Sequence, residues 1–208
     1  MSKVLFVKAN NRPADQAVSV QLYEAFLNSY KTAHPQDEVV ELDLFAENIP
    51  YYDAFVLGAN FKASQGMEVS AEEQAAVDRV NKYLTQFLDA DKVVIAFPLW
   101  NFAVPAVLHS YFDYLSQAGK TFKYTAEGPV GLAGGKKVML LHASGGVYSE
   151  GPGADIELAV RYVQTLLGFW GITDVEKFII EGHNAFPDRS QQIVADGLQN
   201  AATVAQNF

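Results

Sequence analysis

Residues 92–114 read KVVIAFPLWNFAVPAVLHSYFDY and predict a buried strand, a sharp turn and a helix in succession. Residues 93–97 form an unbroken apolar run rich in β-branched side chains, which is typical of a strand buried on both faces of a parallel sheet. Pro105 suits the beginning of a helix, because its φ is already fixed and it has no amide hydrogen to lose. We therefore expect a central strand followed by a helix that packs on the sheet.

The expected helix is amphipathic, and the turn before it carries a candidate ligand site. Its core face is expected to contain Val107, Leu108, Tyr111, Phe112 and Leu115, and its outer face His109, Ser110, Asp113 and Gln117. Leu99, Trp100, Asn101 and Phe102 form the turn, at the carboxyl end of a strand where open α/β sheets bind ligands. A flat ligand with polar edges would fit there.

The composition is that of a soluble globular protein with one core. The chain has 208 residues, of which 50% are hydrophobic, so we expect a single domain over residues 1–208. No apolar stretch approaches the roughly 20 residues that span a bilayer, and no signal sequence precedes the first strand pattern, so we expect a cytoplasmic protein. A net charge of −9 disfavours nucleic acid and anionic membranes as partners. The absence of cysteine excludes disulfides and thiolate chemistry.

The rest of the chain alternates between strand and helix patterns. Further strands are expected at residues 4–9, 39–44, 138–142 and 175–180, the second of them at a sheet edge. The alternation predicts an α/β fold with a five-stranded parallel sheet and right-handed crossovers. Residues 45–69 form a long aromatic connection, for which a lid and a contact with a neighbouring subunit are equally good interpretations. A glycine-rich surface loop is expected at residues 121–137.

Three loops of unusual composition become neighbours if the strand order is 2-1-3-4-5. They are residues 10–19, 99–102 and 143–146, which follow the first, third and fourth strands. In this order they meet at the switch point of the sheet, where ligands bind. A nucleotide is the natural occupant of such a cleft.

The nucleotide-binding motifs of other folds are missing. No G-x-G-x-x-G follows the first strand, and residues 134–137, GGKK, lack the spacing of a P-loop. A helix beginning near residues 16–19 could hold a phosphate through backbone amides and the Ser19 hydroxyl, although Ser19 also fits an ordinary first turn. Trp100 and Phe102 could equally be core aromatics. The Asn101 amide needs partners if it is buried, and Gly145 with Gly146 permits close approach of a ligand or a plain turn.

No residue supplies an evident reactive group. The four histidines, His34, His109, His142 and His183, show no metal-ligand spacing, and Ser144 lacks the preceding glycine of a nucleophile elbow. We therefore expect no metal site and no catalytic side chain. If the protein is reactive, a cofactor must supply the reactivity.

Four segments resemble a known family. They are PLWNF with Pro105 after it, AGKTFKYTAEGPVGL at residues 118–132, the SGG turn followed by GPG, and GFWGIT at residues 168–173. Together they closely resemble the FMN-dependent NADH azoreductases, also described as NADH:quinone oxidoreductases, and most of all the members from Bacillus and its relatives. The resemblance covers nearly the whole chain. It implies a flavodoxin-like three-layer sandwich that forms a homodimer, with one FMN per subunit at the subunit interface.

The resemblance also implies site residues. The phosphate loop would contain Ala17, Val18 and Ser19, with Asn10 near the flavin, and the ring would contact Leu99, Trp100, Asn101, Phe102, Ala143, Ser144, Gly145 and Gly146. Tyr124 and Phe169 are candidates for the substrate side. Two departures reduce the number of donors, because many relatives have a serine at Ala17 and an arginine at Ser144.

The implied activity is reduction of quinones and reductive cleavage of azo dyes, with NADH as the electron donor. A single open flavin face would make NADH and the acceptor take turns, which predicts ping-pong kinetics. Two other classes compete with this interpretation. One is a flavodoxin-type electron carrier, whose Thr/Ser-rich phosphate loop is missing after the first strand, and the other is a structural or regulatory domain without FMN.

Overall fold

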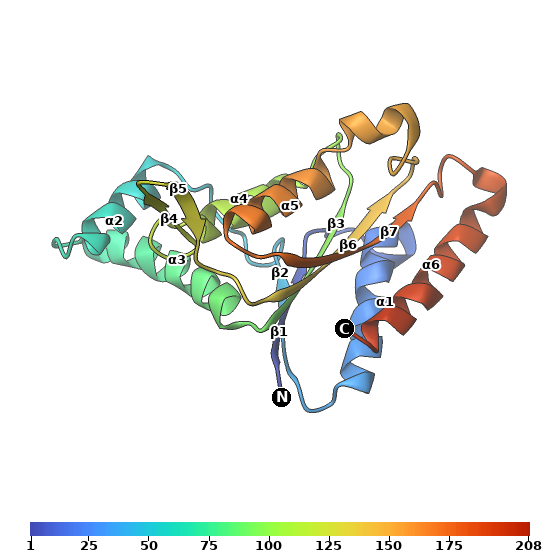
Figure 1. Cartoon of the computed structure of the whole chain (residues 1–208), viewed down its shortest axis with the longest axis horizontal. Coiled ribbons are helices and arrows are strands. Elements are labelled where there is room, and N and C mark those ends of the chain that lie inside the picture. The colour runs from blue at the N-terminus through green and yellow to red at the C-terminus, as the bar shows by residue number, and fades with distance from the viewer.

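A five-stranded parallel sheet forms the centre of the molecule in the computed structural model, which describes all of residues 1–208 (Figure 1). The strands lie in the order β2-β1-β3-β6-β7, all parallel, which confirms the expected order 2-1-3-4-5. Their bounds are β1 Lys3–Lys8, β2 Glu38–Asp43, β3 Lys92–Pro98, β6 Lys137–Ser144 and β7 Asp174–Glu181.

Helices cover both faces of the sheet. One face carries α1 (Val18–Ala33) and α6 (Ser190–Ala205), and the other carries α3 (Ala71–Asp89), α4 (Ala106–Leu115) and α5 (Ala159–Phe169). A capping box begins α3: the Ser70 hydroxyl accepts from the Glu73 N–H, and the Glu73 carboxylate accepts from the Ser70 N–H. No helix is both long enough and apolar enough to cross a membrane.

The central strand β3 pairs with β1 on one side and with β6 on the other. Its residues from Val93 to Phe97 are buried, as expected, and the strand continues to Pro98, which is buried too. The register places Phe97 beside His142 and Pro98 beside Ala143. The turn after β3 and the turn after β6 therefore begin at the same level of the sheet.

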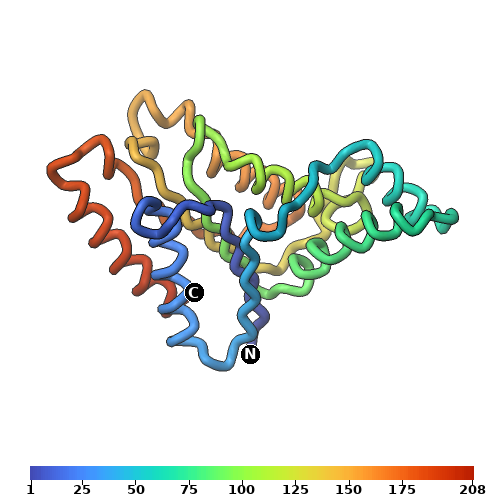
Figure 2. Tube along the Cα trace, turned by 180° about the vertical axis from the view of Figure 1, so that it is seen from behind, coloured from blue at the N-terminus to red at the C-terminus, as the bar shows by residue number.

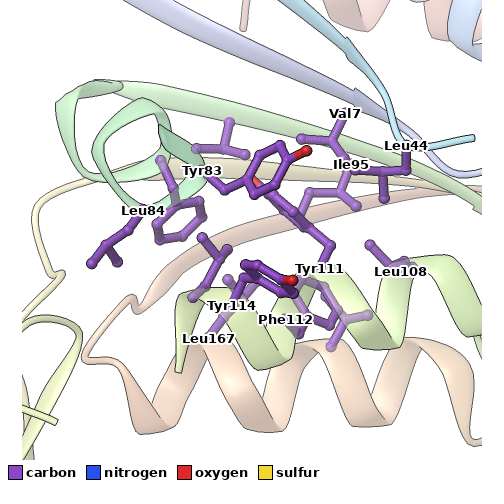
Figure 3. Close-up of a cluster of buried hydrophobic side chains, with 14 of the residues drawn as sticks. Val7, Leu44, Tyr83, Leu84, Ile95, Leu108, Tyr111, Phe112, Tyr114 and Leu167 are labelled. Atoms are coloured by element: carbon purple, nitrogen blue, oxygen red, sulfur yellow. The ribbon is translucent and has the colours of Figure 1, made fainter. Parts of the chain in front are cut away.

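The larger of the two cores lies between the sheet and α3, α4 and α5 (Figure 3). Tyr111, Phe112 and Tyr114 of α4 are fully buried in it. The expected core face of α4 is confirmed, but Ser110, expected on the outer face, is buried and lines a cavity together with residues of the connection between β2 and α2. Pro105 is the residue before α4 and not its first helical residue.

Two segments expected to be irregular contain regular structure. Residues 45–69 include α2 (Ala54–Ser64), whose N-terminus is capped by the Asp53 carboxylate accepting from the Val56 N–H at 3.0 Å. The segment expected as a glycine-rich loop contains an antiparallel hairpin of β4 (Phe122–Thr125) and β5 (Gly128–Gly131).

One expectation near the end of β6 is also wrong. The strand continues to Ser144, so Ala143 and Ser144 are strand residues and only Gly145 and Gly146 remain in the turn. A 3-10 helix (Gly151–Ile156) precedes α5 and leaves Ile156 exposed.

Asp37, between α1 and β2, provides a pH-dependent stability contribution. Its carboxylate accepts from the Ser2 N–H and the Tyr30 hydroxyl, each at 2.7 Å, and these bonds lower the pKa of Asp37. A lowered pKa contributes stability above the unfolded value of about 3.9, and the contribution disappears as the pH falls through the folded value.

We expect Asp37→Asn to lower the free energy of unfolding by about 1–2 kcal/mol at pH 7, with the difference from wild type narrowing below about pH 4. Denaturant melts at several pH values measure this, with the exposed Asp155→Asn as control. A difference that is the same at pH 7 and pH 3 would contradict the assignment.

Candidate functional site

A cleft of about 410 Å³ lies at the carboxyl ends of β1, β3, β6 and β7. The sheet order brings the three predicted loops together there. Predicted cofactor residues that line the cleft are Asn10, Ala17, Val18, Ser19, Leu99, Trp100, Ala143 and Gly145. The other four, Asn101, Phe102, Ser144 and Gly146, do not line it.

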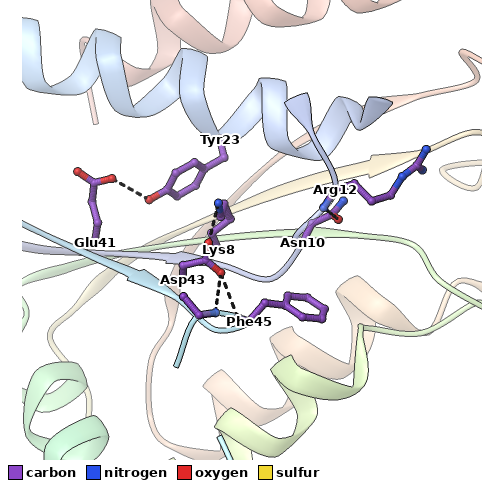
Figure 4. Close-up of polar contacts among 8 residues, drawn as sticks. Lys8, Asn10, Arg12, Tyr23, Glu41, Asp43 and Phe45 are labelled. Atoms are coloured by element: carbon purple, nitrogen blue, oxygen red, sulfur yellow. Dashed lines mark hydrogen bonds and ion pairs between the residues drawn. The ribbon is translucent and has the colours of Figure 1, made fainter. Parts of the chain in front are cut away.

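The first loop is organised by the side chain of Asn10, which is buried beneath it. Its Oδ1 accepts from the Arg12 N–H at 3.0 Å, which turns the chain after β1 (Figure 4). Its Nδ2 donates to the Ser19 Oγ at 2.9 Å. Because Ser19 is the acceptor in this bond, its hydroxyl hydrogen is free to donate to an oxygen atom in the cleft.

The beginning of α1 supplies backbone donors to the same cleft. Ala17 is the N-cap residue and has no side-chain oxygen to cap the helix. The N–H groups of Val18 and Ser19 make no hydrogen bond within the chain. Free amides in the first turn of a helix, together with the helix dipole, favour a phosphate or another anion.

The second loop is a tight turn with unusual backbone angles. Trp100 and Ala103 exchange two backbone hydrogen bonds of 3.0 Å, and both residues between them have positive φ, 50° at Asn101 and 65° at Phe102. Asparagine tolerates this conformation, so the backbone accounts for Asn101, which is exposed and not buried as considered above. A bulky residue such as Phe102 is strained there.

Two contacts connect this turn to the rest of the chain. In the first, the Phe45 ring packs edge-on against Trp100, with 6.3 Å between ring centroids. Phe45 is itself held by Asp43 at the end of β2, which accepts from the Phe45 N–H at 3.1 Å and pairs with Lys8 at 2.8 Å (Figure 4). In the second, the Phe102 carbonyl accepts from the Leu158 N–H at 2.9 Å.

The strain at Phe102 leads to a testable difference between two variants. Phe102→Ala and Phe102→Gly both remove the ring, but only glycine adopts positive φ without strain. We expect Phe102→Gly to be more stable than Phe102→Ala by about 1 kcal/mol in denaturant unfolding without added ligand. Equal stability of the two variants would show that the turn is not strained.

In the third loop Gly145 packs closely against Asn184. A Cβ there would lie 2.4 Å from the Asn184 Nδ2, and the Gly145 carbonyl accepts from the Asn184 and Ala185 N–H groups at 2.9 and 3.0 Å. Ser144 lines a second, smaller cavity of about 200 Å³ together with the buried His142. Burial lowers the pKa of His142.

The cleft contains two residues that the sequence analysis missed, His183 and Asn184, which belong to the loop after β7. Arg12 and Gln16 also line the cleft, and they lie in the predicted loop at residues 10–19. Arg12 and Asp15 are the charged side chains of its lining. The rule that ligands bind at the carboxyl ends of parallel strands could have pointed to the loop after the fifth strand.

Tyr124 and Phe169 lie outside the cleft. Both pack on Phe122, with ring centroids 5.5 and 4.7 Å away. The hairpin that carries Phe122 and Tyr124 lies near α2, at the opposite end of the molecule from the cleft loops (Figures 1 and 2). The structure therefore does not bring these two residues to the site of the same chain.

This parallel sheet, with a polar cleft at its switch point, has the architecture of the flavodoxin-like proteins. Residues 2–204 match a family model described as having a flavodoxin-like fold. Among the relatives is an FMN-dependent NADH:quinone oxidoreductase from Brevibacillus brevis, which is 65% identical over 208 residues and covers 100% of both chains.

Two solved structures show the same likeness. An azoreductase from Bacillus anthracis strain Sterne is 62% identical, covers 100% of both chains and superposes with a TM-score of 0.95. An FMN-dependent NADH-azoreductase from Bacillus anthracis strain Ames Ancestor, solved in complex with FMN, is 30% identical over 99% of this chain and 100% of its own, with a TM-score of 0.86. The chain belongs to this flavodoxin-like family of FMN-dependent NADH:quinone oxidoreductases and azoreductases, as the four sequence segments indicated.

Proposed function

We propose that the chain is an oxidoreductase that binds FMN in the cleft and uses NADH to reduce quinones and to cleave aromatic azo compounds. The observation that carries the proposal is the convergence of three loops with different chemistry on one cleft. Free amides at the start of α1 suit a phosphate, and the turns after β3 and β6 suit a flat ring with polar edges. The relatives named above carry the same cofactor and activities in their names.

The residues of the cleft fit FMN in size and in donor pattern. Val18 and Ser19 offer two backbone N–H groups and one hydroxyl to the phosphate, and Arg12 adds a positive charge nearby. Trp100 and Leu99 form the apolar wall for the ring. Gly145 lets the ring approach the backbone closely.

FMN supplies the redox chemistry when bound, by accepting a hydride from NADH and passing two electrons to the acceptor. The protein would bind and orient the cofactor, and one face of the ring would stay open to the substrates. Backbone N–H groups of the second and third loops would stabilise negative charge on the ring edge. No side chain of the cleft is a nucleophile for the substrate, so the protein contributes position and electrostatics.

Initial rates test this proposal. The chain loaded with FMN is assayed over a matrix of NADH against a quinone, and NADH against an azo dye. We expect parallel double-reciprocal lines, because the donor and the acceptor use one open face in turn. Intersecting lines would contradict a shared site, and complete azo cleavage should consume two NADH per bond.

An electron carrier of the flavodoxin type would behave differently. It would bind FMN but would turn over neither acceptor, and NADH alone would not bleach its flavin rapidly. Anaerobic stopped-flow mixing with NADH separates the two classes. Rapid loss of the oxidised flavin absorbance supports the oxidoreductase.

We further propose that the chain is a homodimer, with a cytoplasmic location as expected from the sequence. The outer side of α2 exposes Phe55, Leu57 and Phe61, and the nearby hairpin exposes Tyr124 and Val130. Exposed apolar patches commonly mark interfaces. A second copy that covers this end would favour the subunit-contact interpretation of residues 45–69 and could bring Tyr124 near the site of its partner.

Light scattering after gel filtration checks the dimer. We expect a mass of twice 22.8 kDa. Leu57→Glu, which introduces a charge into the exposed patch, should shift the protein toward monomer, whereas Glu24→Gln on the exposed surface of α1 should not. Full activity of a wild-type monomer would contradict the proposal.

A further inference from the structure

His183 lies on the wall of the cleft that faces the beginning of α1. It belongs to the loop after β7, and both views place the end of β7 beside the start of α1 (Figures 1 and 2). His183 is among the residues that line the cleft, and its Nδ1 is buried and has no hydrogen-bond partner in the chain. No other group of the chain therefore holds the imidazole through this nitrogen, and the ring remains available to a ligand in the cleft.

The charged groups around His183 are few. From the loop before α1, Arg12 and Asp15 line the same cleft. The end of β6 and the turn after it contribute only Ala143 and Gly145, which carry no charge. In a chain of net charge −9, a phosphate has to be held by local groups of this kind.

Two charged residues on elements next to His183 are already engaged. The Glu181 carboxylate accepts from the Tyr148 and Ser149 N–H groups at 2.7 and 3.1 Å and lines the smaller cavity. The Arg189 guanidinium, just before α6, lies over the Phe186 ring at 4.8 Å. Neither is a partner of the imidazole.

We propose that His183 binds the 5′-phosphate of FMN from the side opposite the first turn of α1. The imidazole takes up a proton from solvent when the phosphate binds between these two groups. This inference rests on the proposed function, because it concerns the same cleft. The ion pair would make His183 a residue that distinguishes FMN from riboflavin, which has no phosphate.

The direction of the pKa shift of His183 agrees with this role. Burial lowers the pKa of His183, so the imidazole is neutral at pH 7 before the ligand binds. A phosphate dianion within hydrogen-bond distance favours the charged form and raises the pKa. Binding is then linked to proton uptake, and the affinity for FMN falls as the pH rises through the pKa of the complex.

Calorimetry of the full chain with FMN tests the inference. Titrations at pH 7 in buffers of different ionisation enthalpy give the number of protons taken up, and we expect a value between 0.5 and 1 as an order-of-magnitude figure. His183→Gln keeps a hydrogen-bond donor but does not titrate. It should lose this uptake and bind FMN about 10- to 100-fold more weakly at pH 6, with riboflavin affinity unchanged.

The controls separate this inference from the proposed function. His34→Gln, at the opposite end of α1, should keep the wild-type uptake. The phosphate of FMN titrates near pH 6 in every variant, so only the difference between variants reports on His183. Unchanged riboflavin binding in His183→Gln shows that the variant is folded.

Tight FMN binding with equal proton uptake in wild type and His183→Gln would overturn this inference alone. Absence of FMN binding to the wild type would overturn the proposed function and this inference with it.

Discussion

Asn10→Leu is expected to weaken FMN binding by about 100-fold, which corresponds to about 3 kcal/mol. The Asn10 amide makes two hydrogen bonds, one to the Arg12 N–H and one to the Ser19 Oγ, and both shape the loop that begins α1. Leucine has a similar size but makes neither bond. The Ser19 Oγ then no longer accepts a hydrogen bond from the Asn10 Nδ2. Without this bond the Ser19 hydroxyl hydrogen is no longer directed into the cleft.

Fluorescence titration of the chain with FMN measures this change. Asn28→Leu serves as the matched control, because Asn28 is exposed on the same helix and lies outside the cleft. Its affinity should equal that of wild type. A Kd for Asn10→Leu within about threefold of wild type would show that the first loop does not depend on this side chain.

Gly131→Ala is expected to lower the free energy of unfolding by about 3 kcal/mol, equivalent to a drop in Tm of about 6–12 °C. A Cβ at Gly131 would lie 2.1 Å from the Gly171 backbone nitrogen. Backbone atoms cannot move aside as a flexible side chain can. Gly171 itself has a φ of +85°, so the crossing of these two segments depends on both glycines.

Gly168→Ala is the control for this variant. Gly168 lies in α5 close to the same crossing, and no atom lies within 4 Å of its Cβ position. Alanine there should leave the Tm unchanged or raise it, because glycine weakens a helix by about 0.5–1 kcal/mol. Equal Tm values for Gly131→Ala and Gly168→Ala would contradict the close packing of the hairpin on the end of α5.

The sheet was predictable because its signal is local. The apolar run at residues 93–97 identified the central strand, and the alternation of strands and helices limited the topology to parallel crossovers. The helix α2 was missed because Phe55, Leu57 and Phe61 leave it without a polar outer face. The hairpin was missed because its strands have only four residues each and contain glycine and proline.

The sequence predicted which loops form the candidate site but not which of their side chains line it. The strand order 2-1-3-4-5 placed three loops together, whereas the direction of each side chain could not be predicted from that order. Ser144 lines another cavity, and Asn101 is explained by its backbone angle and not by burial. His183 was missed because its place beside the start of α1 depends on how α1 crosses the sheet.

The central claim is that three loops at the carboxyl ends of the strands hold one FMN. Amide NMR of the ¹⁵N-labelled chain, titrated with FMN, tests it most directly. We expect saturable shifts at a ratio of one FMN per chain, with the largest changes at the N–H groups of Val18, Ser19 and Gly145. Shifts confined to the β4–β5 hairpin or to α6, with these three amides unchanged, would contradict the site.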